Sequence, residues 1–238
     1  MLDFNHSSIA HMASNDAINA EIDRALTSKI MAEEGRSYLG ASALGHECLR
    51  KIQWDWKRSV AHEPRTQRIF DRGHWAEKYM LQCLEGAGFK VVRDRYTLSF
   101  EQMAGWFKGH ADGMIIDGPT VVAYPCLWEC KGLGSKGWNK LAKHGLEKSY
   151  PAYADQVALY QAYLDLTENP AIFTACNMDT MELLHLAVPF NAERAQAASD
   201  RAVVVIKAER AGETMPRVSD NADDWRCKLC SHKGECWK

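Results

Sequence analysis

The chain has 238 residues, of which 46% are hydrophobic and 25% are charged, and its formal net charge at pH 7 is −2. These values are typical of a globular protein, and the length suits a single domain with a small appendage. They argue against a strongly basic protein that coats nucleic acid, although a local basic groove is compatible with them. The chain contains no run of about 18 apolar residues, so we expect no membrane span.

Hydrophobic periodicity and capping signals predict the order of the elements. After a polar, loose stretch over 1–15, helices are expected over 16–34, 66–86, 136–145, 152–166 and 191–211. The first of these helices is amphipathic and ends at Gly35. A further helix, capped by Ser42, is expected to carry Cys48, with Trp54 and Trp56 following. Strands are expected over 89–100, 106–116, 120–131, 171–177 and 182–188. This order indicates an α/β fold with a mixed central sheet flanked by helices.

The most informative feature is the stretch Gly109-His110-Ala111-Asp112-Gly113, which is followed by Trp128-Glu129-Cys130-Lys131. Asp112 lies near the end of one predicted strand, and Glu129 and Lys131 lie on the next. Side chains two apart on a strand point to the same face, so Glu129 and Lys131 project together, and a hairpin can bring Asp112 beside them. Two carboxylates and an ammonium suit a phosphodiester and a hard divalent ion. Oxygen ligands hold Mg²⁺ or Mn²⁺, and the ion activates water.

Two further pieces fit the same site. Glu77 lies in the predicted helix over 66–86 and could add a third carboxylate. Gln156 and Tyr160 are four residues apart and share one face of a predicted helix. Taken in order, these pieces resemble the PD-(D/E)xK nuclease superfamily, and most closely its RecB-like and phage-exonuclease branch.

The resemblance extends over roughly residues 42–238 and implies a restriction-endonuclease-like core. The sequence departs from the family pattern at Ala111, which replaces the superfamily's Pro, and at Glu77, where many RecB-like members have His. The resemblance implies one or two Mg²⁺ or Mn²⁺ ions held by Glu77, Asp112, Glu129 and the backbone carbonyl of Cys130. It also implies that Lys131 orients or helps to deprotonate the attacking water. Gln156 and Tyr160 then position the DNA backbone or brace Lys131.

A second signal is the C-terminal pattern Cys227-x-x-Cys230-x5-Cys236. The N-terminus has no apolar core after a basic start, so we expect no signal peptide and a cytoplasmic protein. Thiols stay reduced there, and clustered cysteines indicate a metal site before they indicate disulfides. Cys48 is the best candidate for a fourth ligand. Four cysteines suit either an iron–sulfur cluster or Zn²⁺, and His232 offers a Cys₃His alternative.

This cysteine set resembles that of the iron–sulfur nucleases in the RecB-like branch, which include CRISPR-associated exonucleases. The resemblance implies a structural [4Fe-4S] cluster. We therefore expect one nuclease domain over 1–238, with an N-terminal helical extension over 1–41 and a cysteine module over 222–238 that Cys48 completes. The remaining cysteines are expected to be buried apolar residues (Cys83, Cys126 and Cys176) or to face away from the site (Cys130).

A basic segment over 132–150 follows the Glu129-x-Lys131 strand. It predicts a surface that binds the DNA backbone and stacks on bases, formed by Lys136, Trp138, Lys140, Lys143 and Lys148. The alternative is a solvated helix with one buried Trp. A second basic region, formed by Arg50, Lys51, Lys57, Arg58, Arg65, Arg68 and Arg72, is expected to line the same side.

These features together predict a Mg²⁺- or Mn²⁺-dependent DNA exonuclease of a bacterium or a phage-infected host cell. Its roles would be in recombination, repair, or phage or CRISPR DNA processing, with a possible recombination or CRISPR partner protein. The chain has no Walker motif, since Gly132-x-Gly134-Ser135-Lys136 does not match one, so no ATP motor is expected. Two other functions compete with this one. They are a catalytically silent DNA-binding subunit with a nuclease fold, and a zinc-dependent nucleic-acid-binding module.

Overall fold

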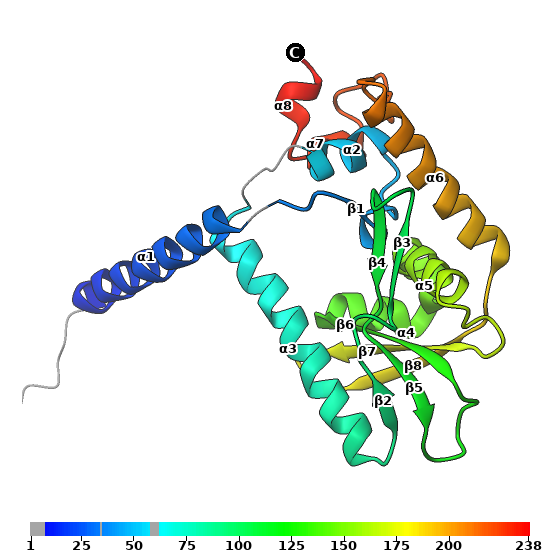
Figure 1. Ribbon diagram of the computed structural model, residues 1–238. Coiled ribbons are helices and arrows are strands. Elements are labelled where there is room, and N and C mark those ends of the chain that lie inside the picture. Colours follow the sequence, from blue (N-terminus) through cyan, green and yellow to red (C-terminus); the bar gives the residue numbers. More distant parts are fainter. Residues whose placement is uncertain (1–7, 34, 58–61) are drawn as a thin grey trace, which may run out of the picture.

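The computed structural model of the chain describes residues 8–33, 35–57 and 62–238. Its helices are α1 (Ser8–Ala32), α2 (Leu49–Lys57), α3 (Pro64–Gly86), α4 (Ser135–Ser149), α5 (Pro151–Tyr163), α6 (Ala192–Arg210), α7 (Trp225–Lys228) and α8 (Lys233–Cys236), with a short 3₁₀ turn η1 (Ala41–Ala43). Its strands are β1 (Leu39–Gly40), β2 (Lys90–Val92), β3 (Ser99–Gln102), β4 (Phe107–His110), β5 (Gly113–Asp117), β6 (Cys126–Leu133), β7 (Ala171–Asn177) and β8 (Leu183–Val188). Figure 1 shows their arrangement.

The main sheet has the strand order β2-β5-β6-β7-β8. β6 and β7 are parallel, whereas the other neighbouring pairs are antiparallel. The sheet is therefore mixed, as the sequence predicts. β6 lies in the middle, and this position buries its functional residues. Its start moves from the predicted residue 120 to Cys126 because Pro119 and Pro125 bound a turn, and proline cannot donate to a sheet ladder.

Alternate residues of β6 face opposite sides of the sheet. Trp128 and Cys130 pack with Met80 of α3 in one apolar cluster. Leu127 belongs to the larger core on the other face, which includes residues of α4, α5 and α6. Glu129 and Lys131 therefore point toward the α5 side, and the Cys130 side chain points away from them, as predicted.

A smaller sheet, which the sequence did not predict, pairs β1 with β4 in parallel and β3 with β4 antiparallel. The predicted strand over 106–116 is in fact divided between the two sheets. Ala111 and Asp112 connect β4 to β5, so Asp112 lies between strands rather than within one. The predicted strand over 89–100 is also broken, by a turn over 93–98. Alternating hydrophobicity gives no sign of such a change of sheet, because both halves keep a period of two.

Gly109 makes this crossing possible. A Cβ at this position would lie 2.3 Å from the Phe100 ring and 2.7 Å from the Tyr160 ring. Only glycine leaves room for the aromatic side chains here. The backbone therefore passes close to α5 at Gly109, three residues before Asp112.

The helices confirm most predictions but not those near the N-terminus. α1 begins at Ser8, within the stretch predicted to be loose, and residues 1–7 lie outside the described part. The expectation of an amphipathic helix is wrong, because Ile18 is 61% and Met31 76% exposed while Ile30 is buried. An ion pair between Asp23 and Arg68 links α1 to α3.

Cys48 precedes α2 instead of lying inside a helix. The ring Nδ1 of His46 accepts a hydrogen bond from the Cys48 N–H at 3.0 Å. The Cys48 amide is therefore bonded to the side chain of a residue two positions earlier. The helix starts at the next residue, Leu49. The Cys48 thiol therefore lies just before the first residue of α2.

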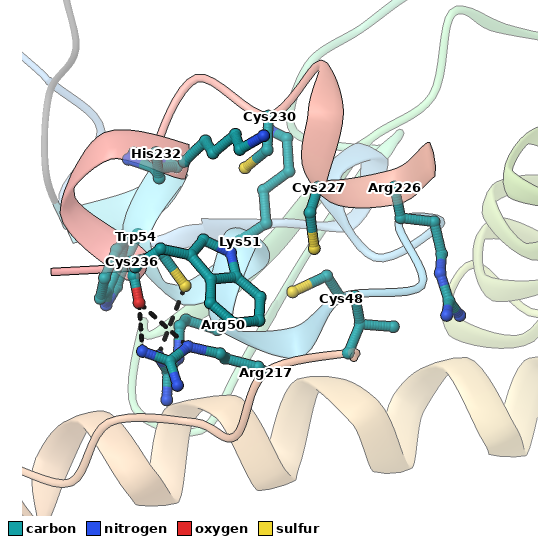
Figure 2. A pocket seen from close by; sticks show the side chains of 13 residues that line it. Cys48, Arg50, Lys51, Trp54, Arg217, Arg226, Cys227, Cys230, His232 and Cys236 are labelled. Atoms are coloured by element: carbon teal, nitrogen blue, oxygen red, sulfur yellow. Dashed lines mark hydrogen bonds between the residues drawn. The ribbon is translucent and has the colours of Figure 1, made fainter. Parts of the chain in front are cut away.

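The C-terminal segment returns to α2 (Figure 2). Arg50 donates to the Met215 carbonyl at 2.6 Å, and the Met215 N–H donates to Gln53 at 2.9 Å. Arg217 donates to the Cys236 carbonyl at 2.9 Å. These bonds hold the C-terminal segment against α2, and the three cysteines of the tail line the same cavity as Cys48. In the described helices, no segment is long and apolar enough to cross a membrane.

A buried carboxylate fastens α5 to α6, and this predicts a stability effect. Asp155, only 8% exposed, forms ion pairs with Arg194 and Arg201. Asp155→Asn removes the charge between two guanidinium groups. We expect it to lower the free energy of unfolding by about 2 kcal/mol, below the cost of breaking a fully buried pair because both arginines are partly exposed. Urea denaturation measures this, with the exposed Glu168→Gln as control. Equal midpoints for both variants would contradict it.

Candidate active site

Glu129 and Lys131 form the centre of the candidate active site. Glu129 is fully buried on β6, and its Oε1 accepts a hydrogen bond from the Lys131 ammonium. The two residues project together, as their spacing on the strand predicts. The other carboxylate oxygen of Glu129, Oε2, is buried and has no hydrogen-bond partner among the described residues. Buried polar atoms are nearly always satisfied, so this oxygen is a candidate ligand for a cation.

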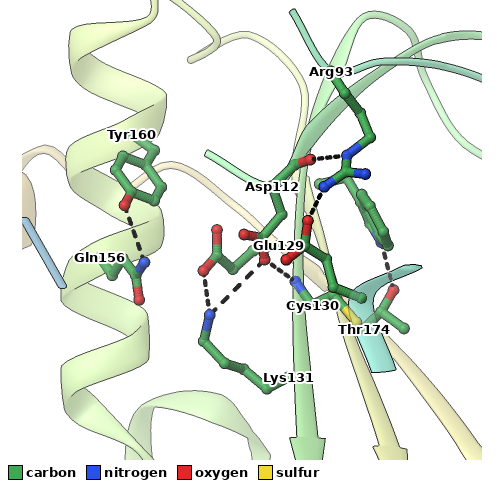
Figure 3. Close-up of polar contacts among 10 residues, drawn as sticks. Arg93, Asp112, Glu129, Cys130, Lys131, Gln156, Tyr160 and Thr174 are labelled. Carbon is green, nitrogen blue, oxygen red and sulfur yellow. Dashed lines mark hydrogen bonds and ion pairs between the residues drawn. The ribbon is translucent and has the colours of Figure 1, made fainter. Parts of the chain in front are cut away.

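Asp112 lies beside this pair, as the predicted β5–β6 hairpin requires (Figure 3). Its Oδ2 accepts a hydrogen bond from the Cys130 N–H at 2.8 Å and lies 3.9 Å from the Lys131 Nζ. The bond to the Cys130 amide fixes the carboxylate against the strand that carries Glu129. Three of the predicted residues, Asp112, Glu129 and Lys131, therefore converge on one point.

The charges at this point are strongly coupled. Burial and the neighbouring Asp112 raise the pKa of Glu129 to about 8, although Lys131 opposes the shift. Burial lowers the pKa of Lys131, but the charges of Glu129 and Asp112 outweigh it and raise the pKa above its usual range. Lys131 therefore stays charged. The crowding of carboxylates is what a divalent cation would relieve.

Glu77 reaches the site from α3, where it forms an ion pair with Arg93. Burial and the charge of Asp112 raise the pKa of Glu77, which places the two carboxylates near each other. Arg93 also donates from Nε to the Asp112 carbonyl at 3.1 Å. Arg93 was missed by the sequence analysis, since a single arginine after a short strand carries no signal of its own.

Gln156 and Tyr160 lie on the face of α5 that is turned toward the site (Figure 3). The Gln156 side-chain amide donates to the Tyr160 hydroxyl at 3.1 Å, and both side chains are buried. Burial raises the pKa of Tyr160, and the charge of Glu129 raises it further. The predicted Gln-x-x-x-Tyr pair thus lies close to the carboxylates.

Tyr153 is a second residue that the sequence analysis missed. Lys131 Nζ lies 5.4 Å from the centre of its ring, a cation–π distance. The ring stacks on Tyr150 and Phe173. The Lys131 ammonium is therefore held by two carboxylates and one aromatic face.

The side chains do not form a ready metal cage. In the part of the chain that the structure describes, no group of three or more His, Cys, Asp or Glu residues is arranged to hold a metal ion. Two of the carboxylates form ion pairs with basic side chains of the protein. Glu77 pairs with Arg93, and Glu129 pairs with Lys131. Binding a divalent ion would require these two side chains to exchange a protein cation for the metal.

The four predicted cysteine ligands line one small cavity with His232 (Figure 2). Cys48 enters from the start of α2, and the other three enter from the C-terminal segment. Arg50 Nη1 donates to the Cys236 sulfur at 3.4 Å. Further cations, Lys51, Arg217 and Arg226, line the same cavity. The predicted ligands thus share one cavity, but among the described residues these cysteines, too, form no group of three or more that is arranged to hold a metal ion.

His232 is already engaged. Its Nε2 hydrogen-bonds to Asp55 at 2.8 Å, and its ring meets the edge of Trp54. Of the other cysteines, Cys126 and Cys176 are buried and Cys83 is half-buried. Every cysteine is a free thiol in the described part of the chain.

The basic segment after β6 forms α4. Its lysines, Lys136, Lys140, Lys143 and Lys148, are exposed. Trp138 instead packs against the core, and its Nε1 donates to the Ala175 carbonyl at 3.3 Å. These contacts favour the packing alternative for Trp138. In the second basic region Arg68 is paired with Asp23, and Arg58 lies outside the described residues.

The mixed sheet and its flanking helices define an exonuclease-like fold. One solved structure that shares it is an alkaline exonuclease, LHK-Exo, from Laribacter hongkongensis. It is 13% identical with a TM-score of 0.52, over 74% of this chain and 89% of that one. Another is SSO0001, 13% identical with a TM-score of 0.51, over 92% of this chain and 95% of that one. At these identities the likeness concerns the fold. No protein-family model and no curated protein matches the sequence.

Proposed function

We propose that this chain is a metal-dependent DNA nuclease that acts as an exonuclease. The observation that carries the proposal is the convergence of Asp112, Glu129 and Lys131 at the middle of the sheet, with Glu129 Oε2 buried and unpartnered. The fold shared with an alkaline exonuclease supports it. A charged lysine beside two carboxylates suits a phosphodiester better than it suits a neutral substrate.

The divalent ion, Mg²⁺ or Mn²⁺, would be held by Glu77, Asp112, Glu129 and the Cys130 carbonyl. The unpartnered Glu129 oxygen and the all-oxygen donor set fit such an ion. When bound, it supplies Lewis-acid stabilisation of the phosphate and lowers the pKa of water. Arg93 would release Glu77 and keep its bond to the Asp112 carbonyl, so Asp112 stays in place during this exchange.

Lys131 acts through its charge in this proposal. Its raised pKa keeps the ammonium protonated, so it offsets the negative charge of the phosphate and orients water by donating hydrogen bonds. Tyr153 and Glu129 restrict the ammonium to one position. Gln156 and Tyr160 brace this arrangement from α5 and contact the DNA backbone.

The exposed lysines of α4 are proposed to contact DNA phosphates. They begin three residues after the end of the buried strand that carries Glu129, since β6 ends at Leu133 and Lys136 follows it. Contacts of this kind are independent of sequence and sensitive to salt. They suit an enzyme that processes DNA ends in recombination, repair, or phage or CRISPR DNA metabolism.

We further propose that the cysteine cavity holds a [4Fe-4S] cluster, with Zn²⁺ as the alternative. Four thiolates suit both, and the surrounding Arg50, Lys51, Arg217 and Arg226 offset their negative charge. The bond of His232 to Asp55 favours four sulfur ligands, since one ring nitrogen is already used. The cluster would join the segment before α2 to the C-terminal tail.

Digestion of end-labelled DNA tests the nuclease proposal. Single- and double-stranded linear DNA should be degraded with Mg²⁺ or Mn²⁺, and EDTA should stop the reaction because the carboxylates act through the ion. A covalently closed circle is the control for exonuclease action and should stay intact. Cleavage of the circle at the linear rate would indicate an endonuclease. No cleavage of any DNA with either metal would refute the proposal.

A further inference from the structure

The turn over 93–98 is fastened at both ends to the residues that carry the active site. At its start, Arg93 Nε donates to the Asp112 carbonyl at 3.1 Å. At its end, the Leu98 carbonyl accepts the Ala111 N–H at 3.0 Å, and Leu98 is only 1% exposed. The turn is therefore held against the backbone that places the Asp112 carboxylate.

The turn is also fixed internally. Asp94 Oδ2 accepts the Thr97 N–H at 2.9 Å and the Thr97 hydroxyl at 2.7 Å. The Leu98 N–H donates to the Asp94 carbonyl at 3.0 Å. Side-chain caps of this type define the conformation of a short turn. The side chains at the tip of the turn are therefore carried by a backbone of defined conformation.

The tip of this turn presents Tyr96, which is 95% exposed. One residue, Thr97, separates it from the buried Leu98, so its Cα lies within about 7 Å of the Leu98 Cα. Arg95 stands beside it. Burial, and then the charge of Arg95, lower the pKa of His110, which places Arg95 near the strand end that leads to Asp112. An exposed aromatic ring and a cation are therefore carried by a turn that is bonded to the backbone of Ala111 and Asp112.

We propose that Tyr96 is a stacking platform for an unpaired nucleobase of the strand being cleaved, with Arg95 contacting the adjoining phosphate. This proposal rests on the proposed nuclease function, and it specifies that the DNA strand is unpaired at the site. Every base has a π face, so such stacking is independent of sequence. A base inside a duplex is already stacked on both faces, so only a single strand or a frayed end can supply one. The DNA is accordingly unpaired beside the scissile phosphate.

The test uses binding without cleavage. A single-stranded oligonucleotide carrying 2-aminopurine at successive positions is titrated with the full chain in EDTA. In the wild type, fluorescence should be quenched at one or two neighbouring positions, and anisotropy gives the affinity. Tyr96→Ala should lose that quenching and bind about tenfold more weakly, as expected for the loss of one stacked base. Tyr96→Phe should retain both, because the ring remains.

Trp225→Ala is the matched control, since Trp225 is a 72% exposed aromatic residue on the cysteine module. It should bind and quench as the wild type does. Tyr96→Ala with wild-type quenching and affinity overturns the stacking role, and so does a wild type that binds no oligonucleotide. A wild type that binds and depends on Tyr96 but cleaves no DNA refutes the nuclease function alone. A wild type that cleaves while Tyr96→Ala binds normally refutes the stacking alone.

Discussion

Asp112→Asn is expected to reduce DNA cleavage by at least about 100-fold while the protein stays folded. Asparagine keeps an oxygen that can accept the Cys130 N–H bond seen at 2.8 Å, so the local structure survives. The negative charge that would help to hold the divalent ion is lost. Lys131→Ala should have an effect of similar size, because it removes the only ammonium seen against Glu129 and Asp112 among the described residues.

Two measurements separate a lost site from a lost fold. Thermal unfolding should show Asp112→Asn close to the wild type and Lys131→Ala folded with a lower midpoint, because that variant leaves the buried Glu129 without its cation. Calorimetric titration with Mn²⁺ should show weaker binding for Asp112→Asn. Asp220→Asn removes an exposed carboxylate and serves as control, with unchanged cleavage. Full activity of either site variant would remove the active-site assignment. A variant that binds Mn²⁺ normally but does not cleave would restrict Asp112 to a role other than metal binding.

The part of the site that the sequence predicts is the part governed by local periodicity. Glu129 and Lys131 share a face because they are two apart on β6, and Gln156 and Tyr160 share one because they are four apart on α5. β7 begins and ends at the predicted residues 171 and 177, since its mostly apolar run has turn signals on both sides. These features need no knowledge of the rest of the chain.

The parts that the sequence does not predict depend on contacts between distant residues. Arg93 bonds to Glu77, which is 16 residues away in the sequence, and to the Asp112 carbonyl, which is 19 residues away. Tyr153 meets Lys131 only because α5 packs on β6. The small sheet depends on β1, a strand of two residues that is too short to show a period. No local pattern records any of these pairings.

Cys48 illustrates both cases. Its chemistry indicated a partnership with the C-terminal cysteines, and the cavity lined by all four agrees with that. Its position in a helix was predicted wrongly, because its amide donates to the His46 side chain and α2 begins one residue later, at Leu49. Residue type therefore indicated which cysteines lie together, whereas the position of Cys48 before the helix could not be predicted from it.

Cys48→Ser should lower the thermal midpoint by about 10 °C, which corresponds to about 3 kcal/mol for a chain of this length. Cys48 is the only proposed ligand outside the C-terminal tail, so its loss removes the metal-mediated link between the tail and the segment before α2. Metal binding in such a module contributes directly to the free energy of folding. Purified wild type should be brown, with iron and acid-labile sulfide, if the cavity holds a [4Fe-4S] cluster. A colourless protein with zinc would indicate the closed tetrahedral site instead.

Cys83→Ser is the matched control, because it makes the same chemical change at a half-buried thiol on α3 that does not line the cavity. Its midpoint should stay within about 2 °C of the wild type, and its metal content should be unchanged. Elemental analysis of both variants measures whether the metal is lost with the thiol. Full metal content of Cys48→Ser at a lowered thermal midpoint would show that Cys48 has a purely structural role. Equal, small effects from both substitutions would show that Cys48 is not the fourth ligand. His232→Asn would then be expected to release the metal, because Nδ1 of His232 is the remaining donor in the same cavity.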